Sequence, residues 1–350
     1  NGTVPARVDK DSITVFSPFG LGVLDMAVCQ FVHKLGTEQG VGTLVSSFLP
    51  APWTKENGNG NGNGNGNGHK HSSAPVATDK QRTLDDDWME RYERDGYLFI
   101  PDFLEPHEVD ELVNELPAIF SEEGPQRVLE KDGRYVRSVY GSNATNPVFG
   151  KLSRHPKLLE LAKRILDSDV YVYQFKLNAK LALVGDLWEW HQDYIFWLKE
   201  DGLPAPRVLS AVIFLHEVNE FNGPMFLIPG SHREGVFDVA GDEELPSGYD
   251  DSPAWISNLT ANLKYSLDRE TVEKLVSRYG IVAPKGPRGS VLLFHSNLAH
   301  ASSPNLSPYD RPLAIISYNS VENIPVSSKK PRPEFLVSRD YRPLTPHSGR

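Results

Sequence analysis

From Tyr135 onward the sequence consists mainly of short β-type runs that Gly, Pro, Asn and Asp separate. Many short strands with turn residues between them are typical of an antiparallel sandwich or barrel, and this pattern restricts the fold most. Amphipathic spacing also predicts helices at residues 84–95, 108–120 and 268–279. We therefore predict a mainly β fold with flanking helices. The clearest β-type runs are RYVRSVY, VYVYQFKLNAKLAL, WEWHQD, VLSAVIFLHEV, GPMFLIPGSH, GSVLLFH and RPLAIISYNSV.

An Asn-Gly repeat is expected to divide the chain. Six consecutive Asn-Gly pairs fill residues 57–68. Because this segment has no apolar side chains to bury and would lose much conformational entropy on ordering, we predict a flexible tether. The predicted organisation is an N-terminal segment at 1–55, a linker at 56–80 and one β domain at 81–350.

Composition narrows the class of partner. The chain has 350 residues and a formal net charge of −10, which argues against a nucleic acid or an anionic membrane as its main partner. No apolar run approaches the roughly 20 residues that span a bilayer. Cys29 is the single cysteine, so an internal disulfide and a cysteine-built metal site are excluded. We therefore expect a cytoplasmic protein that acts on a small molecule, and a homodimer is compatible with this composition.

The tripeptide His191-Gln192-Asp193 closes one of the β-type runs. In a strand, residues i and i+2 point to one side, so His191 and Asp193 are expected to converge on a single atom. A second histidine far along the chain would complete a set of two imidazoles and one carboxylate, and His295 and His300 both follow a later strand. Such a set binds Fe(II) and leaves coordination positions open.

An arginine that follows this second histidine region is a candidate to bind a carboxylate. Arg311 stands eleven residues beyond His300 and opens the next β-type run. A guanidinium there can hold a carboxylate with two hydrogen bonds. A facial iron site plus a carboxylate clamp is what an oxygenase that depends on 2-oxoglutarate requires. The same histidines and aspartate would also suit a zinc-binding or non-catalytic barrel, but neither of those needs the arginine.

Several blocks in order resemble the phytanoyl-CoA dioxygenase superfamily of Fe(II)/2-oxoglutarate oxygenases, and most closely its ectoine hydroxylase branch. The resemblance covers about residues 86–323 and implies a double-stranded β-helix, also called a jelly roll. The blocks that carry it are RDGYLFIPDFL, EKDGRYVRSVYGSN, VYQFKLNAK, WHQDYIFWLKEDG, NGPMFLIPGSHREG and GSVLLFHSNLAHASSPNLSPYDRPLAIISYNSVEN.

The resemblance implies a set of metal ligands and a reaction. Carried over by position, the iron ligands are His191, Asp193 and His300, because the family motif has another polar residue where His295 stands. The implied reaction is hydroxylation with Fe(II), with 2-oxoglutarate and O2 as co-substrates and succinate and CO2 as products. The presence of Asp193 favours hydroxylation over halogenation, since related halogenases lack this carboxylate.

The resemblance also implies the contacts of the two organic molecules. Arg311 matches the 2-oxoglutarate clamp, and Asn178 matches a position near the same co-substrate. Gln174 and Trp197 match positions that line the organic substrate in ectoine hydroxylases. An insertion at residues 237–279 is unusually long for the family, and its sequence assigns it no role.

The N-terminal segment suggests the substrate class. Residues 8–45, with the stretch TVFSPFGLGVLDMAVCQFVHKL, resemble the C-terminal tail of the ornithine cyclodeaminase family. The resemblance implies a cyclodeaminase-like domain fused upstream. Our first hypothesis is therefore a hydroxylase of a small free amino acid, cyclic or basic, or of a zwitterion derived from one, and the alternative is an ectoine-type substrate.

Overall fold

The computed structural model describes residues 86–241, 245–249, 252–326 and 331–347. The cyclodeaminase-like segment at 1–55 and the Asn-Gly linker at 56–80 lie outside the described residues. The division of the chain at these boundaries therefore stays a prediction.

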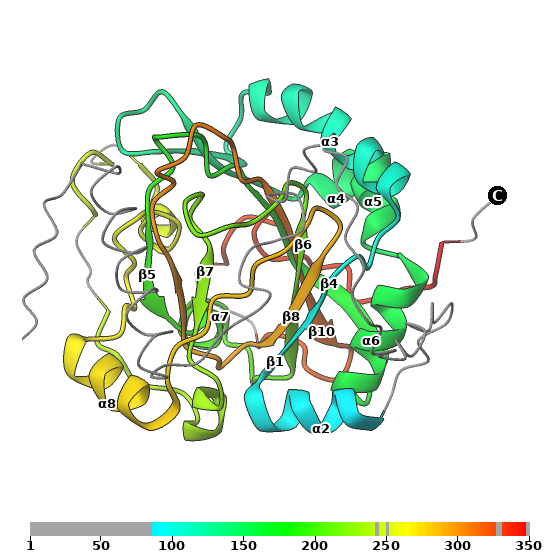
Figure 1. Cartoon of the computed structure of the whole chain (residues 1–350), viewed down its shortest axis with the longest axis vertical. Coiled ribbons are helices and arrows are strands. Elements are labelled where there is room, and N and C mark those ends of the chain that lie inside the picture. The colour runs from blue at the N-terminus through cyan, green and yellow to red at the C-terminus, as the bar shows by residue number, and fades with distance from the viewer. Residues whose placement is uncertain (1–85, 242–244, 250–251, 327–330, 348–350) are drawn as a thin grey trace, which may run out of the picture. The chain divides into compact units, whose positions relative to one another are not determined.

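Two antiparallel sheets form the centre of the described structure (Figure 1). The larger has seven strands in the order β1-β8-β6-β10-β4-β3-β2, and the smaller has three in the order β5-β9-β7. Apolar side chains of both sheets, such as Phe214, Leu227 and Phe294, form one buried cluster between them. The larger sheet contains β1 (Tyr97–Ile100), β2 (Arg127–Leu129), β3 (Val136–Tyr140), β4 (Val170–Asn178), β6 (Val208–Phe214), β8 (Val291–His295) and β10 (Leu313–Ser320), and the smaller contains β5 (Trp188–His191), β7 (Met225–Leu227) and β9 (His300–Ser302).

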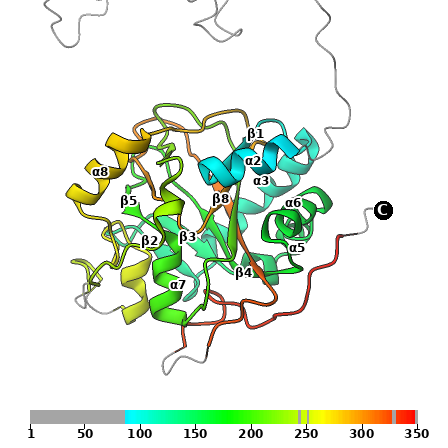
Figure 2. The ribbon, with the colours of Figure 1, turned by 90° about the horizontal axis from the view of Figure 1, so that it is seen from below.

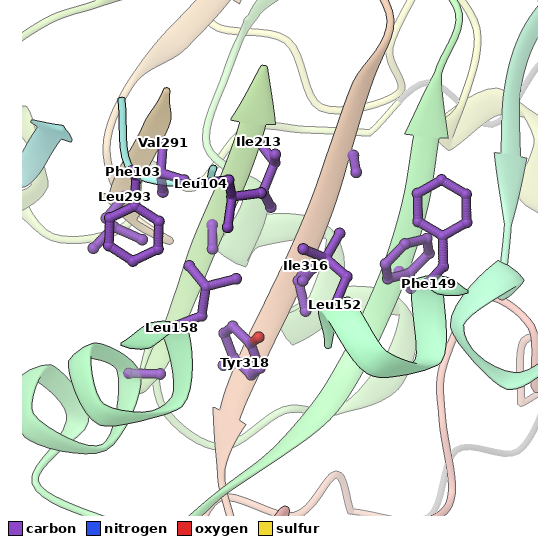
Figure 3. Close-up of a cluster of buried hydrophobic side chains, with 14 of the residues drawn as sticks. Phe103, Leu104, Phe149, Leu152, Leu158, Ile213, Val291, Leu293, Ile316 and Tyr318 are labelled. Carbon is purple, nitrogen blue, oxygen red and sulfur yellow. The ribbon is translucent and has the colours of Figure 1, made fainter. Parts of the chain in front are cut away.

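Helices cover the outer face of the larger sheet, opposite the smaller one (Figure 2). Period-two alternation places Ile213, Leu293 and Ile316 on this face, where they pack against Leu152 and Leu158 of the helices (Figure 3). The helices here are α2 (Asp86–Asp95), α3 (Pro106–Ser121), α4 (Ser142–Thr145), α5 (Pro147–Leu152) and α6 (Pro156–Leu166). The predicted mainly β fold with flanking helices is confirmed, and α2 and α3 lie where helical spacing placed them.

A β-bulge in β4 decides which of its side chains face the space between the sheets. Val172 pairs with Tyr318 and Gln174 pairs with Ser317, so Tyr173 has no partner on β10. The extra residue shifts the alternation by one position. Even-numbered residues before the bulge therefore face the helices, whereas Gln174 and the even-numbered residues after it face the inner side.

The strand prediction for the His-Gln-Asp segment is wrong in one respect. β5 ends at His191, and Asp193 is the first residue of helix α7 (Asp193–Asp201). Gln192 keeps an extended backbone, with φ −112° and ψ 137°, and the helical conformation begins at Asp193. The predicted helix at 268–279 is α8 (Arg269–Tyr279), which Asp268 caps through a hydrogen bond from the Thr271 N–H.

The insertion at residues 237–279 also contains η3 (Ala254–Asn258), a short 3₁₀ helix, and η2 (Ser231–Glu234) precedes the insertion. Within the part of the chain that the structure describes, no helix has the length and apolar character needed to cross a membrane.

Candidate active site

His191, Asp193 and His300 converge on one point between the sheets. Their ligand atoms all lie within 4.8 Å of one another. The register between β5 and β9 pairs His191 directly with His300, so their ring centroids are 4.1 Å apart. The start of α7 then turns the carboxylate toward both rings, with Asp193 Oδ1 at 3.6 Å from Nε2 of His191 and 3.8 Å from Nε2 of His300. The expected convergence is therefore present, but a strand–helix junction produces it.

Backbone carbonyls orient both imidazoles. Nδ1 of His191 lies 2.6 Å from the Glu189 carbonyl oxygen, and Nδ1 of His300 lies 2.9 Å from that of Leu298. A proton on Nδ1 can donate to each carbonyl, which leaves the Nε2 lone pairs directed at the carboxylate. Burial and, to a smaller extent, the nearby His191 lower the pKa of His300 to about 3, so this ring is neutral at physiological pH.

The remaining side chains of the junction keep this arrangement in place. Gln192 points away from the three ligands, donates to the carbonyls of Gly235 and Asn297, and accepts from the Phe237 N–H. Ser210 donates to the Asp193 carboxylate at 3.3 Å. The ligand geometry is thus held by contacts to three other segments.

The donor set fits Fe(II). Two neutral imidazoles and one carboxylate on one side of an ion are the ligands of non-haem iron oxygenases. Burial alone would raise the pKa of the Asp193 carboxyl, but His300, His191 and Lys176 together lower that pKa below its usual range. The carboxylate is therefore ionised, as a metal ligand must be.

His295 takes no part in this cluster. It ends β8, its Nδ1 accepts from the Asn297 N–H, and its ring lies tilted against that of His232, with 5.3 Å between the ring centroids. Burial lowers its pKa to about 4. The structure therefore brings His300, and not His295, to the other two predicted ligands.

One cavity adjoins the ligand histidines on the side of β10. Arg311, Asn178 and Ser302 supply polar groups to this Arg311 cavity. Apolar side chains line the rest, namely Phe294, Leu313, Ile315 and Met225. The two residues predicted to hold 2-oxoglutarate thus lie in the same cavity as His191 and His300.

Arg311 is a buried cation without a carboxylate partner. Its side chain is 1% exposed, and it donates only to the backbone carbonyls of Asn222 and Gly223. Burial lowers its pKa to about 9. No described residue forms an ion pair with it, and the amide oxygen of Asn178 is also buried without a described partner. A buried guanidinium needs a charged partner, and a carboxylate in this cavity would supply it.

A second cavity lies on the other side of the ligand set. This Asn258 cavity contains the predicted substrate residues Gln174 and Trp197 together with Asp193. Nε2 of Gln174 donates to the Leu336 carbonyl at 2.9 Å, and the Trp197 ring packs edge-on against Tyr173. Lys176, Trp188 and His191 line both cavities, so the two spaces meet beside the metal ligands.

Sequence reasoning missed four polar residues of the site. Lys176 could have been found, because it alternates with Gln174 and Asn178 on β4. Its pKa is lowered by burial, and it makes no hydrogen bond or ion pair with any described residue. The other three lack a local signal, since they come from β3, from the insertion and from the C-terminal segment. They are Tyr140, Asn258 and Arg332.

The chain is similar in sequence to a known family and to known hydroxylases. Residues 92–313 match the phytanoyl-CoA dioxygenase (PhyH) family. The chain is 39% identical over 256 residues to an L-proline trans-4-hydroxylase of Streptomyces griseoviridis, a match that covers 73% of this chain and 93% of the relative. It is 34% identical over 272 residues to an ectoine dioxygenase of Bordetella bronchiseptica, covering 74% of this chain and 85% of the relative.

A solved structure shows the same fold. The crystal structure of EctD from S. alaskensis with 2-oxoglutarate and 5-hydroxyectoine superposes with a TM-score of 0.64 at 30% sequence identity. The match covers 75% of this chain and 87% of that one. A structure of the same protein with bound Fe gives a TM-score of 0.62. The predicted jelly-roll oxygenase fold is confirmed.

Proposed function

The chain belongs to the phytanoyl-CoA dioxygenase family, and from this premise we propose that it hydroxylates a small free amino acid, first of all a cyclic one such as L-proline. It is a 2-oxoglutarate-dependent dioxygenase that uses Fe(II) and O2. The chemistry that iron and 2-oxoglutarate supply when bound is oxidative decarboxylation to succinate and CO2, coupled to insertion of one oxygen atom into a substrate C–H bond.

The observation that carries the proposal is the pair of cavities that share one metal-ligand set. His191, Asp193 and His300 would hold the iron between them. Arg311 would hold the far carboxylate of 2-oxoglutarate, and Asn178 would donate to or accept from the same molecule. The Asn258 cavity would then position the amino acid beside the metal, so that a C–H bond faces the oxidising centre and water is excluded.

Three further features support an amino acid over a larger substrate. Polar side chains on an aromatic wall suit a zwitterion. A net charge of −10 fits poorly with a polyanionic acyl-CoA. The relative that is a proline hydroxylase matches over 93% of its own length. Ectoine is the second candidate, since two of the similar proteins act on or bind ectoine-type molecules.

A substrate panel tests the proposal. The purified chain would be incubated with Fe(II), 2-oxoglutarate, O2 and one of L-proline, pipecolate, ornithine, lysine, arginine or ectoine. We expect succinate and a product heavier by one oxygen atom with a cyclic amino acid, measured by mass spectrometry. An Asp193→Ala variant serves as the matched control and should yield neither. A gain of oxygen by ectoine alone, or by an acyl-CoA compound added to the panel and by no amino acid, would contradict the proposal while leaving the oxygenase class intact.

We extend the proposal to the rest of the chain on sequence grounds. A cytoplasmic location follows from the single cysteine, and a cyclodeaminase-like domain upstream follows from the resemblance of residues 8–45. A homodimer is proposed as the solution state, which light scattering on the purified chain would check. Removing residues 1–80 should leave the oxygenase folded and active, and loss of soluble protein would contradict the predicted boundary.

A further inference from the structure

Asn258 carries an amide that the protein itself leaves unsatisfied. Its side chain is 6% exposed, and both its amide nitrogen and its amide oxygen are buried without a hydrogen-bond partner among the described residues. Buried polar groups in native proteins are nearly always paired, so such a group calls for a ligand or an ordered water. It lines the Asn258 cavity, in which Asp193 and His191 also lie.

A second unpaired group lines the same cavity from another element. The Tyr140 side chain, at the end of β3, is 2% exposed, and its hydroxyl has no hydrogen-bond partner among the described residues. The Ser138 hydroxyl is close enough to lower the pKa of Tyr140 slightly, but the two do not have hydrogen-bond geometry. Burial is the larger effect and raises that pKa to about 12, so Tyr140 retains its proton and can donate it.

The segment that carries Asn258 is held firmly against the barrel. Nε of Arg137, on β3, donates to the Leu259 carbonyl at 3.0 Å, and the Leu263 N–H donates to the Glu189 carboxylate at 2.9 Å. Arg137 is itself fixed by an ion pair with Glu130 at 2.9 Å. The residues that directly follow Asn258 are thus fixed to the barrel, and the amide is presented to the cavity by a supported backbone.

The charges around the cavity favour a carboxylate. Arg332 lines it but is paired with Asp201 through two hydrogen bonds of 2.8 Å and 2.5 Å, which neutralises its charge. Lys176 also lines it and forms no ion pair with a described residue. The Asp193 carboxylate also lines the cavity and attracts Lys176, but bound Fe(II) would compensate the charge of that carboxylate. Lys176 and the unpaired donors of Tyr140 and Asn258 then make an anionic group a better occupant than a second cation.

We infer that Asn258 and Tyr140 form the subsite that recognises the α-amino-acid head of the substrate, an inference that rests on the proposed function. The Asn258 amide offers one donor group and one acceptor, so its N–H binds the α-carboxylate and its oxygen accepts from the adjacent ammonium, primary or secondary. The Tyr140 hydroxyl donates to the carboxylate as well. The insertion at 237–279 thereby acquires a role, since it contributes the residue that selects free amino acids.

Binding of L-proline to the wild type and to Asn258→Ala tests this subsite. The titration would be calorimetric, without O2, on protein loaded with Fe(II) and 2-oxoglutarate, and KM values would be measured in parallel. A hydrogen bond to a charged group is worth about 1.5–3 kcal/mol, so Asn258→Ala should weaken L-proline binding about ten- to a hundredfold. The affinity for 2-oxoglutarate should not change. Tyr140→Phe should give a similar loss in the same direction.

Controls separate recognition from local damage. Ser257→Ala alters the neighbouring residue of η3, whose hydroxyl bonds to the Ala254 carbonyl and does not line the cavity, so it should bind L-proline as the wild type does. L-Prolinamide, which lacks the carboxylate but keeps the ammonium, should bind weakly to the wild type and lose less affinity than L-proline does in Asn258→Ala. That non-additivity would identify the carboxylate as the group that is recognised.

The outcomes distinguish this inference from the proposed function. If the wild type binds and hydroxylates L-proline but Asn258→Ala binds it equally well, the subsite is wrong and the proposed function stands. An equal loss with L-proline and L-prolinamide would also overturn the subsite. If the wild type hydroxylates none of the amino acids in the panel, the proposed function is wrong, and the subsite that rests on it is wrong as well.

Discussion

The Arg311 cavity and the Asn258 cavity meet at the same metal ligands, yet different parts of the chain build them. Strands of the two sheets supply the lining of the Arg311 cavity, except for Arg311 itself, which lies just before β10. The Asn258 cavity also takes side chains from α7, from the 237–279 insertion and from the C-terminal segment. Its cation Arg332 is neutralised within the protein, whereas Arg311 has no carboxylate partner among the described residues.

The two cavities differ in this way because one would hold the co-substrate and the other would select the molecule to be oxidised. A co-substrate that is the same for every member of a class can be held by the hydrogen-bonded core of the sheets. The molecule to be oxidised must be selected, and residues from appended segments can vary without disturbing the sheets. Variants in the two cavities should therefore have different kinetic signatures.

The largest effect is expected where the cavities meet. Replacing His191, Asp193 or His300 with Ala removes one of three ligands and should abolish both Fe(II) binding and succinate formation. Metal titration and a succinate assay would measure the two losses. His295→Ala is the matched control, because this histidine lies outside the ligand cluster, and it should retain activity. Full activity in a variant of any of the three ligands would refute that assignment.

A large effect on stability is expected in the wall of the Asn258 cavity. Asp201→Asn would leave the buried Arg332 without its counter-ion, and breaking such a pair typically costs about 3–5 kcal/mol. Urea unfolding would measure the change. Asp340→Asn breaks an exposed pair with Arg342 and should change stability little. Equal changes in the two variants would show that the buried pair does not support this wall.

Arg311→Ala should affect binding in the Arg311 cavity only. Loss of a charge-assisted contact of about 1.5–3 kcal/mol raises the KM for 2-oxoglutarate roughly ten- to a hundredfold. The KM for the amino acid should stay near the wild-type value, because Arg311 does not line the Asn258 cavity. Steady-state kinetics with each co-substrate varied in turn would test the separation. An unchanged dependence on 2-oxoglutarate would place the clamp elsewhere.

The smallest effect should come from substitution of two polar residues on β4. Gln174 and Asn178 face the same side of the strand but line different cavities. Gln174→Ala removes a neutral hydrogen-bonding group and should raise the KM for the amino acid about two- to tenfold, since such a bond is worth about 0.5–1.5 kcal/mol. Asn178→Ala should instead raise the KM for 2-oxoglutarate. Identical profiles for the two variants would mean that the cavities are not separate in function.

Local pattern accounts for most of what could be predicted. Alternating β-type runs located the strands, because side chains of a sheet alternate between its faces. The candidate metal ligands could be proposed from the sequence because their side-chain types and order limit the chemistry, and the structure brings them together. The helix at Asp193 was not predicted, since the strand pattern before it suggested that the same conformation continued. Asp193 still reaches the histidines because the first turn of α7 directs its carboxylate back toward them.

The sequence by itself determined a mainly β oxygenase fold and the identity of the residues suited to bind iron and a carboxylate. Both depend on short-range patterns and on the chemistry of single side chains. Only the tertiary structure decided that a bulge turns Gln174 inward, that Asn258 of the insertion reaches the cavity, and that Asp201 neutralises Arg332. These features arise where segments distant in the chain pack together, and no local pattern encodes which side chains that packing leaves without a partner.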